Sequence, residues 1–409
     1  MARFSSASDA IFGHGKVSTA HGFRRFAWAH NAWARIFWLV VFAAAFMGLA
    51  VLLVFLLIDY LKCEAKSVVN SKTANPLFPS VTVCNLNPLK QSILTNAQIT
   101  TLNAAMVGNG VASPRSMVSD EVAKTASSTN GHNISSFILY CSYDAKLCND
   151  ETNFTPYTSK QFGQCFTFNS GPTANKLVTQ LGPLHGLALI LNAERQEHMG
   201  GVGESDGFRV SVHPLGSDPF PEIQGFSVPT GKEVLVGIAE KERLRLGKPY
   251  GECDDDDGLK NGFKKTTLSC AAECASSSTC NCYPPCRETE YDLGFSLTNW
   301  PNEKHNATLI NMLQSRGGLD FGTRMDDLTT VKVFFKDFSK LIYDQEPAYS
   351  LSRLFTQVGG LSALLVGISI LSLCEAFDMG ASMAVADGVG SKDDENSLYP
   401  QAEDSFRSQ

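Results

Sequence analysis

The stretch IFWLVVFAAAFMGLAVLLVFLLI, residues Ile36–Ile58, decides the class of fold because it runs for 23 residues without a charged side chain. About 20 apolar residues in a helix span the hydrocarbon core of a bilayer. A signal peptide is the poorer explanation, since the run is long, begins late and has no small-residue cleavage site behind it. The stretch therefore predicts a first transmembrane helix over 36–58.

A second uncharged stretch lies near the other end of the chain. Leu354–Cys374 runs for 21 residues, and Gln357 is its most polar member. We expect a second transmembrane helix over 348–377, so that most of the chain, residues 59–347, forms one large domain between the two spans.

Three features orient these spans. Lysine and arginine dominate the segment before the first span, which favours a cytoplasmic N-terminus. Ten cysteines lie well inside the region between the spans, which suits an oxidising compartment, and all three glycosylation sequons also lie in this region. We expect a plasma-membrane protein with an extracellular domain over 59–347, and with cytoplasmic segments over 1–35 and, as an acidic tail, over 378–409. The basic residues are Arg3, Lys16, Arg24, Arg25 and Arg35, and the sequons are at Asn133, Asn153 and Asn306.

The domain between the spans reads as a disulfide-rich, β-rich α+β fold. Several segments alternate apolar and polar residues between Gly and Pro turns, which is typical of strands. Residues 96–136, rich in Ala, Ser, Thr and Asn, predict short peripheral helices. The net charge of −7 and the absence of a basic stripe argue against a nucleic-acid partner. The predicted strands lie in Phe78–Asn85, Cys165–Gly171, Gly186–Glu194, Phe208–Pro214, Lys232–Leu246 and Thr329–Phe338.

A dense group of six cysteines occupies residues 253–286. Zinc is one explanation of such a cluster, but an oxidising compartment and the lack of a nearby histidine favour disulfides. Six cysteines allow 15 pairings, which spacing alone does not resolve. We expect a nested ladder of Cys253–Cys286, Cys270–Cys282 and Cys274–Cys280. We expect Cys63 to stay unpaired and Cys374, within the second span, to stay reduced.

Two short patterns could indicate an enzyme or a metal site, but each has a simpler structural explanation. GESDG, residues Gly203–Gly207, matches the serine-hydrolase elbow, which needs a preceding strand and a following helix. A strand-like segment follows it instead, so we interpret it as an acidic loop. The run Asp254–Asp257 could bind a divalent cation, but a solvated charge run is the commoner explanation. We expect no enzyme activity, no metal site and no cofactor.

The second span has a face of small residues. Thr356, Gly360, Ala363 and Gly367 are spaced 4, 3 and 4 apart, which places them on one side of a helix. Such a face lets membrane helices pack closely, or it leaves room for a water-filled pathway between several copies. Glu375 and Asp378, at the end of the span, favour the pathway because carboxylate rings attract cations.

Several motifs, in order, resemble the degenerin/epithelial sodium channel family, which includes acid-sensing and peptide-gated channels. The resemblance covers most of the chain and comes from separate segments. The segments are TAHGFRRF with His21-Gly22, FPSVTVCNLN, CFTFNSG, GLALILNAERQEHM, FRVSVHPLGSDPF, CNCYPPCRETEY and GGLSALLVGISILSLCEAFD.

The resemblance implies a homotrimer or heterotrimer that passes Na⁺ through a central pore in the membrane. Each subunit would carry a palm, a finger and a thumb. Gly367, Ile368 and Ser369 would break the second helix and form the selectivity filter. The resemblance also assigns roles to three further groups of residues. Thr356, Gly360 and Ala363 would form the gate and line the pore, with Ala363 near the amiloride site. Glu375 and Asp378 would form the inner mouth, and His21 and Gly22 would form an N-terminal gating loop.

The chain departs from the resemblance in the thumb, about 253–286. Only five residues separate Cys274 from Cys280, so the thumb is short and the acids that it would place opposite the finger are missing. Glu197, Glu204 and Asp206 resemble the finger side of an acidic, proton-sensing pocket. Tyr250 takes the place of an aromatic residue that touches the first helix. The stimulus, whether proton, peptide or force, stays open.

We also expect the disulfides Cys84–Cys165 and Cys141–Cys148. The predicted function is a sodium-preferring cation channel gated by an extracellular stimulus, with amiloride sensitivity, membrane lipid around it and a proton or peptide as ligand. Two alternatives stay open. An ATP-gated trimeric receptor shares two spans and ten cysteines but needs clustered lysines for phosphate, and a non-conducting two-span receptor needs no filter.

Overall fold

The computed structural model divides into two compact units, of which the first contains residues Met1–Lys66 and Pro347–Gln409 and the second Ser67–Glu346. We call them the helical unit and the sheet unit. The structure describes residues 31–107, 131–171, 174–198, 205–254, 259–260, 263–276, 282–315 and 323–367, together with residues 369, 372, 374 and 377.

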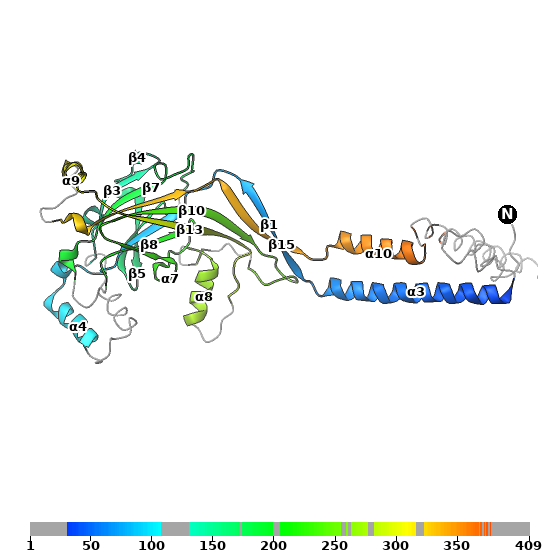
Figure 1. Cartoon of the computed structure of the whole chain (residues 1–409). Coiled ribbons are helices and arrows are strands. Elements are labelled where there is room, and N and C mark those ends of the chain that lie inside the picture. Colours follow the sequence, from blue (N-terminus) through cyan, green and yellow to red (C-terminus); the bar gives the residue numbers. More distant parts are fainter. Residues whose placement is uncertain are drawn as a thin grey trace, which may run out of the picture. The chain divides into compact units, whose positions relative to one another are not determined.

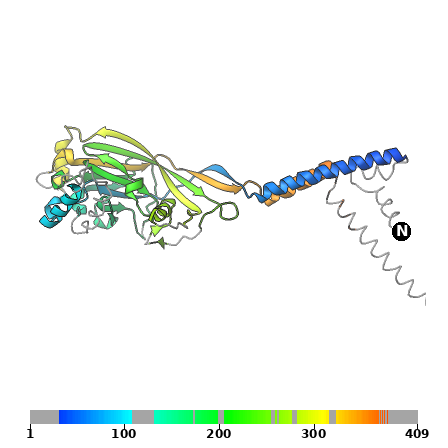
Figure 2. The same ribbon diagram turned by 90° about the horizontal axis from the view of Figure 1, so that it is seen from below.

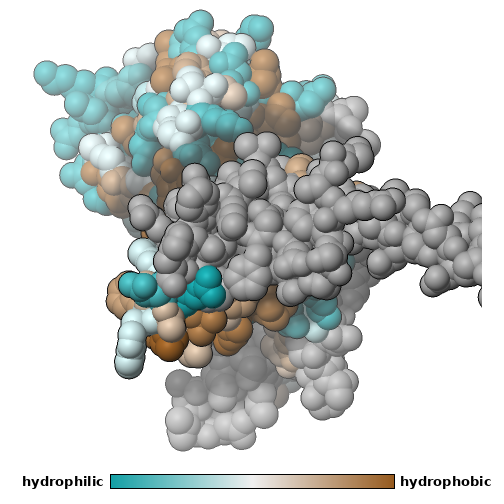
Figure 3. All heavy atoms as spheres, turned by 90° about the vertical axis from the view of Figure 1, so that its right-hand side faces the viewer, coloured by the Kyte–Doolittle hydropathy of each residue, from teal (hydrophilic) through white to brown (hydrophobic). Residues whose placement is uncertain are grey.

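The helical unit contains α3, Ala32–Leu61, and α10, Leu351–Leu365 (Figure 1). Within the described ranges, α3 is the one helix that is long and apolar enough to cross a membrane. It is longer than the predicted 36–58 segment at both ends, and most of its large hydrophobic side chains are exposed, including Phe37 and Phe55. The face drawn in Figure 3 carries hydrophobic residues at the surface beside hydrophilic ones.

The sheet unit contains a mixed eight-stranded sheet. Its strand order is β1-β15-β10-β14-β7-β3-β4, and β13 also pairs with β10. The long strand β10 pairs antiparallel with β13 and parallel with β14 and then β15. The strands are β1 Ala65–Thr73, β3 Ile138–Tyr143, β4 Lys146–Leu147, β7 Leu187–Asn192, β10 Lys232–Leu244, β13 Arg287–Asn299, β14 Leu328–Phe335 and β15 Ser339–Pro347.

A second, five-stranded sheet is antiparallel throughout, in the order β5-β6-β2-β8-β9. Every residue of its central strand β2 is buried, and the side chains of its polar residues Ser80, Thr82 and Asn85 are hydrogen-bonded. The strands are β2 Ser80–Asn85, β5 Phe154–Ser159, β6 Gly163–Phe168, β8 Gly207–His213 and β9 Phe226–Pro229, and a separate small hairpin joins β11 Leu259–Lys260 to β12 Phe263–Lys264.

Short helices complete the sheet unit. The helices α4 and α9 lie at the same end of this unit in Figures 1 and 2. The α-helices are α4 Asn96–Val107, α6 Ile134–Phe137, α7 Pro221–Gln224, α8 Thr267–Ser276 and α9 Asn306–Ser315, and the 3₁₀ turns are η1 Gln91–Ile93, η2 Glu151–Asn153, η3 Arg195–Glu197 and η4 Met325–Asp327.

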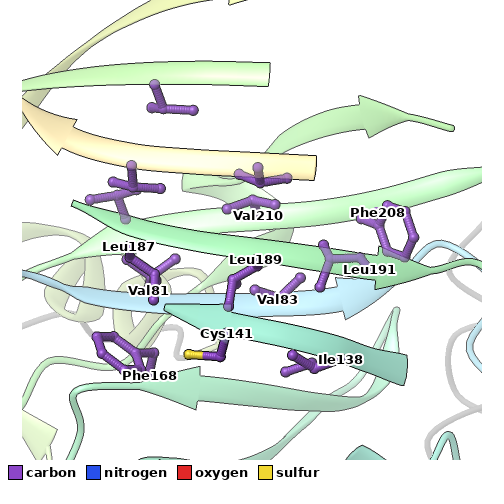
Figure 4. Packing of buried hydrophobic residues seen from close by; sticks show 14 of the residues in the cluster. Val81, Val83, Ile138, Cys141, Phe168, Leu187, Leu189, Leu191, Phe208 and Val210 are labelled. Atoms are coloured by element: carbon purple, nitrogen blue, oxygen red, sulfur yellow. The ribbon is translucent and has the colours of Figure 1, made fainter. Parts of the chain in front are cut away.

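The main hydrophobic core lies between the two sheets. Leu187, Leu189 and Leu191 of β7 alternate toward the same core as Val81 and Val83 of β2, as Figure 4 shows. All five side chains are at most 1% exposed. Each such burial contributes roughly 1.5–3 kcal/mol, which is why the two sheets pack together. The six strands predicted from alternation are present as β2, β6, β7, β8, β10 and β14. The sequence pattern did not predict β1, β3, β4, β5, β9, β11, β12, β13 and β15.

The five-stranded sheet also buries a histidine in a chain of hydroxyl groups. His213 Nε2 lies 2.9 Å from Thr82 Oγ1, and its Nδ1 lies 3.1 Å from Ser217 Oγ. Since Ser217 Oγ donates to the carbonyl oxygen of Pro214, it accepts from Nδ1, and Thr82 donates to Nε2. One ring proton therefore satisfies the neutral imidazole.

We expect this histidine to make the sheet unit sensitive to acid. Burial lowers the pKa of His213 to about 4, against a weaker opposing effect of the carbonyls of Pro214 and Ser217. The unfolded chain binds a proton near pH 6.5, so this stabilisation is complete above that pH and is lost toward pH 4, by about 3 kcal/mol. Hydrogen exchange of β2 and β8 amides between pH 7 and 4, corrected for intrinsic exchange, measures it.

His213→Gln should show a smaller loss of protection over the same pH range, from a lower starting stability. His305→Gln, at an exposed histidine, is the control and should behave as wild type. An undiminished acid response in His213→Gln would contradict this assignment.

Candidate functional site

The small-residue face of α10 is turned away from α3, its neighbour within the helical unit. Thr356, Gly360 and Ala363 are exposed. By contrast, Gln357 and Leu361 line a cavity of about 260 Å³ together with Leu52, Leu56 and Asp59 of α3 and Tyr349. Packing on α3 therefore does not explain the small residues of α10.

The same face has open space around it within one chain. A Cβ atom added at Gly359 or Gly360 would meet nothing within 4 Å. Thr356 bonds its own helix, since Oγ1 donates to the carbonyl oxygen of Ser352 at 2.9 Å. Larger side chains at these positions are therefore compatible with the fold of a single chain.

The end of α10 explains why the predicted filter begins with a glycine and ends with a serine. Gly367 has a φ of +71°, in the left-handed region that L side chains rarely adopt, and its N–H donates to the carbonyl oxygen of Ala363 at 3.1 Å. A glycine in this conformation just after the last turn is a common helix stop. The continuous helix thus ends before residue 368.

Ser369 has the chemistry of a helix start. Its Oγ accepts from the N–H of Ser372 at 3.3 Å, three residues further on, as an N-cap side chain does. Ser372, Cys374 and Phe377 are helical. Gly367 and Ser369 therefore act as a stop and a start on either side of one residue, and α10 alone, at 15 residues, is shorter than the predicted span.

Several predicted site residues lie outside the described residues. These are Ile368 of the filter, Glu375 and Asp378 of the inner mouth, His21 and Gly22 of the N-terminal motif, and Glu204 of the finger.

The two described finger acids are not paired with each other. Glu197 Oε2 accepts from the N–H of Ser92 at 3.0 Å. Asp206 forms ion pairs with Arg195 Nε and with His198 Nδ1, each at 3.1 Å. The described part of the predicted acidic pocket is thus an ion-pair network rather than a pair of opposed carboxylates. Tyr250 lies half-buried in the turn after β10, and its coupling to the first helix stays a prediction.

Sequence reasoning missed a buried ionic cluster beside these acids. Glu194 is 5% exposed and accepts from Lys90 Nζ at 2.6 Å and from His132 Nδ1 at 2.5 Å. Burial raises the pKa of this carboxyl, but the bonds from His132 and Lys90 outweigh burial and hold the pKa below its ordinary value. A sequence separation of 62 residues between His132 and Glu194 left no local signal.

A second buried carboxylate follows at η4. Asp327 is fully buried, and its Oδ1 lies 3.3 Å from Arg195 Nε, the same nitrogen that contacts Asp206. Burial raises the pKa of Asp327, with Arg195 acting in the opposite direction. Arg195 also donates to Thr230 Oγ1. One guanidinium therefore links η3 to η4, to the residue before β8 and to the residue after β9.

The structure contains the disulfides Cys84–Cys165, Cys141–Cys148, Cys253–Cys286 and Cys270–Cys282, which coincide with four of the five expected pairs. Cys274 is also disulfide-bonded, and its expected partner Cys280 lies outside the described residues. Cys63 and Cys374 are free thiols. The cysteine cluster is thus oxidised, which excludes the zinc interpretation for these residues.

The described residues of the other two patterns show no catalytic or metal-binding geometry. Strand β8 begins at Gly207, so a strand and not a helix follows the hydrolase-like pentapeptide. In the acidic run, Asp254 pairs with Lys265 at 2.7 Å, and residues 255–257 lie outside the described ranges. Among the described residues, no group of three His, Cys, Asp or Glu side chains could hold a metal ion.

Comparison with known protein families identifies the class of this protein. The family model described as amiloride-sensitive sodium channel matches residues 15–279 and 275–379. The chain therefore belongs to the amiloride-sensitive sodium channel family, whose members are ion channels and not enzymes.

The related proteins include degenerins and sodium channels. The degenerin-like protein unc-105 of Caenorhabditis elegans is 25% identical over 62% of this chain and 35% of its own length. The FMRFamide-activated amiloride-sensitive sodium channel of Cornu aspersum is 22% identical, and the match covers 91% of this chain and 83% of that protein. The chain thus spans about a third of the nematode protein and most of the snail channel.

Acid-sensing ion channel 1C of Danio rerio is 25% identical over 88% of this chain and 81% of its own length. Among solved structures, a proton-activated chloride channel matches 84% of this chain with a TM-score of 0.37 and 6% identity, which is too low to carry an argument.

The three sequons differ in their surroundings. Asn133 is exposed, and its side chain only caps α6, at 3.5 Å from the N–H of Ser135. Asn153 donates its amide to the carbonyl oxygens of Asp150 and Cys148, and the side-chain oxygen of Asn306 is buried. Because a glycan replaces an amide hydrogen and must be accommodated in the fold, Asn133 is the best acceptor.

We expect Asn133→Gln to remove most of the glycan-dependent mobility shift of the chain expressed in eukaryotic cells. The measurement is gel mobility before and after treatment with an N-glycosidase, and Asn306→Gln is the matched control. A shift that persists in Asn133→Gln and disappears in Asn306→Gln would contradict this order. A complete lack of glycan would contradict the extracellular placement of the sheet unit.

Proposed function

We propose that the chain is a subunit of a trimeric, sodium-preferring cation channel of the plasma membrane, gated by an extracellular stimulus. The observation that carries the proposal is the small-residue face of α10, which is turned away from α3 and ends in a glycine stop. Such a face has no use in packing the single chain. It suits contact with other copies around a water-filled pathway.

The proposed filter follows from the helix break. Non-helical backbone at membrane depth is tolerated where it is buried in protein or lines water. Three copies of residues 367–369 around an axis would present carbonyl oxygens that partly replace the hydration shell of Na⁺. Thr356, Gly360 and Ala363 would line the path above, and Glu375 and Asp378 would attract cations at the inner mouth.

Family membership supports the channel and leaves the finer properties as proposals. The snail and fish relatives are named for activation by a peptide and by acid, so the stimulus differs among relatives. We propose amiloride block near Ala363. We propose Na⁺ as the permeant ion and no cofactor.

The alternatives make different demands. An ATP-gated receptor needs lysines gathered for phosphate, whereas the described cations of the long strands, such as Lys241 and Arg243, are paired with Asp292 and Glu290. A non-conducting two-span receptor needs no helix break. The two experiments below separate these alternatives from the channel.

The first experiment tests the gate. We expect Thr356→Phe to give a standing inward Na⁺ current in oocytes under voltage clamp, because a bulky side chain opposes closure of the small faces on one another. A penalty of about 1.4 kcal/mol on the closed state raises the open population about tenfold. Phe355→Trp adds bulk at the neighbouring exposed position and should leave the current at its wild-type value.

An unchanged current in Thr356→Phe at normal surface expression, together with no response to acid or peptide, would refute the channel. Current in both variants would show that bulk on α10, rather than its small face, is responsible.

The second experiment tests the filter in the Thr356→Phe background. Gly367→Ala forces an L side chain into the left-handed region, at a cost of roughly 1–2 kcal/mol, and Ser369→Ala removes a cap. We expect both to lower the preference for Na⁺ over K⁺, measured as the shift in reversal potential when K⁺ replaces external Na⁺. Gly359→Ala meets nothing within 4 Å and is the control.

If Gly367→Ala and Ser369→Ala alter only the amount of protein at the surface and leave the reversal potential unchanged, the proposed filter is wrong.

A further inference from the structure

The turn η3 is fixed to several segments that are distant in the sequence. Its first flanking residue, Glu194, has a φ of +49°, which costs a non-glycine residue roughly 1–3 kcal/mol and persists only where the surroundings hold it. Glu194 is held by Lys90 and His132, Arg195 by Asp206 and Asp327, and the other flanking residue, His198, by Asp206.

His132 faces an acceptor at each of its ring nitrogens. Its Nδ1 lies 2.5 Å from the Glu194 carboxylate, and its Nε2 lies 2.9 Å from the carbonyl oxygen of Asn87. A carbonyl oxygen only accepts, and a neutral imidazole has a single N–H. Both bonds therefore require a second proton, and the His132 side chain is only 1% exposed.

His198 repeats this arrangement on the other side of the turn. Its Nδ1 lies 3.1 Å from the Asp206 carboxylate, and its Nε2 lies 3.3 Å from the carbonyl oxygen of Ala193. Again neither partner can donate unless a carboxylate is protonated. Each histidine–carboxylate pair therefore holds one proton more than a neutral ring beside an ionised acid.

Among the described residues, the other charged groups near the two rings have partners of their own. Lys90 reaches the second oxygen of Glu194 and Ser136 Oγ. Arg195 lies between Asp206 and Asp327, and Glu197 points to the N–H of Ser92. Loss of a proton leaves one ring nitrogen of each histidine with a lone pair that faces an acceptor, either the carboxylate at Nδ1 or the carbonyl oxygen at Nε2, so one of its two bonds is lost.

Two other histidines show that this need for a second proton is specific. His213 is satisfied by one proton because both of its partners are hydroxyl groups. His185 contacts Asp144 through Nδ1 at 3.0 Å and is part-exposed, so one tautomer of the neutral ring suffices.

We propose that the η3 turn is a proton-binding site, in which protonated His132 and His198 fix residues 194–198 to the segments around them, and in which release of these protons loosens the turn. The histidines are not among the predicted pocket acids, although His198 pairs with one of them, Asp206, and they act in place of the missing carboxylate pair. Because each histidine needs a second proton to make both of its bonds, the contacts weaken as the pH rises. An effect on ion current rests additionally on the proposed channel function.

The test uses the full chain in lipid nanodiscs and reads hydrogen exchange at pH 5.5, 6.5, 7.5 and 8.5, corrected for intrinsic exchange. The reporters are the amides of Glu197 and His198, which bond to the carbonyl oxygens of Glu194 and Arg195. We expect their protection to fall about tenfold or more as the pH rises, since each pH unit weights one bound proton tenfold.

His132→Gln and His198→Gln should each reduce this pH dependence, and the double variant should abolish it. His185→Gln is the matched control and should keep it. His198 is part-exposed, so the His198→Gln variant decides the matter if the buried His132→Gln variant fails to fold. Wild-type protection independent of pH, or undiminished pH dependence in His198→Gln, would overturn the proposal.

A second readout separates the site from the channel. In the Thr356→Phe background, the standing current should change between pH 6 and 8, and the His132→Gln/His198→Gln pair should flatten that change. If the double variant loses the pH dependence of hydrogen exchange but keeps the pH dependence of the current, the link between the η3 turn and the pore is wrong. A lack of current in all variants counts against the channel function alone, because the exchange measurement still decides the proton site.

Discussion

The pairing of β10 is the constraint on which the rest of the sheet unit depends. One edge of this strand bonds to β13 over thirteen residue pairs, and its other edge bonds first to β14 and then to β15. In the sequence β13 lies between β10 and β14 and runs antiparallel to β10, so β14 and β15 can run parallel to β10 on its other edge. The excursion from β10 to β13 contains the cysteine-rich thumb, and Cys253–Cys286 closes its base. A thumb can therefore be shortened without disturbing the sheet, as its two ends are held by β10, β13 and one disulfide.

Hydrophobic alternation predicted the strands that face the core between the sheets and failed for those that do not. Strands β2, β7 and β14 bury most of their residues, so their sequences carry the pattern. Strand β13 is mostly half-buried or exposed. It is held to β10 by its backbone pairing and by cross-strand ion pairs such as Arg243–Glu290. Charged strands of this kind have no apolar period, and only the position of the partner strand identifies them.

Some parts of the candidate site could likewise be predicted from the sequence, and others could not. The small face of α10 and the glycine and serine of the break are local in the sequence, so spacing and resemblance could identify them. The structure adds the physical reason, a helix stop at Gly367 and a capping hydroxyl at Ser369. The ionic cluster around η3 is not local. His132, Glu194 and Asp327 come from three separate segments, and only the fold brings them together.

The histidines of the sheet unit show how the same side chain acquires opposite roles. His213 lies among hydroxyl groups that can both donate and accept, so burial keeps its ring neutral, and acid destabilises its sheet. His132 and His198 lie among carboxylates and carbonyl oxygens, which only accept, so their contacts need protons, and alkali weakens them. The two responses act on different segments. Falling pH weakens the contacts of β8, and rising pH weakens the contacts of η3. Extracellular pH would therefore change the balance between two parts of one ectodomain rather than its stability as a whole. Under the proposed channel function, such a balance would let the sheet unit respond to protons without the carboxylate pair of the predicted acidic pocket.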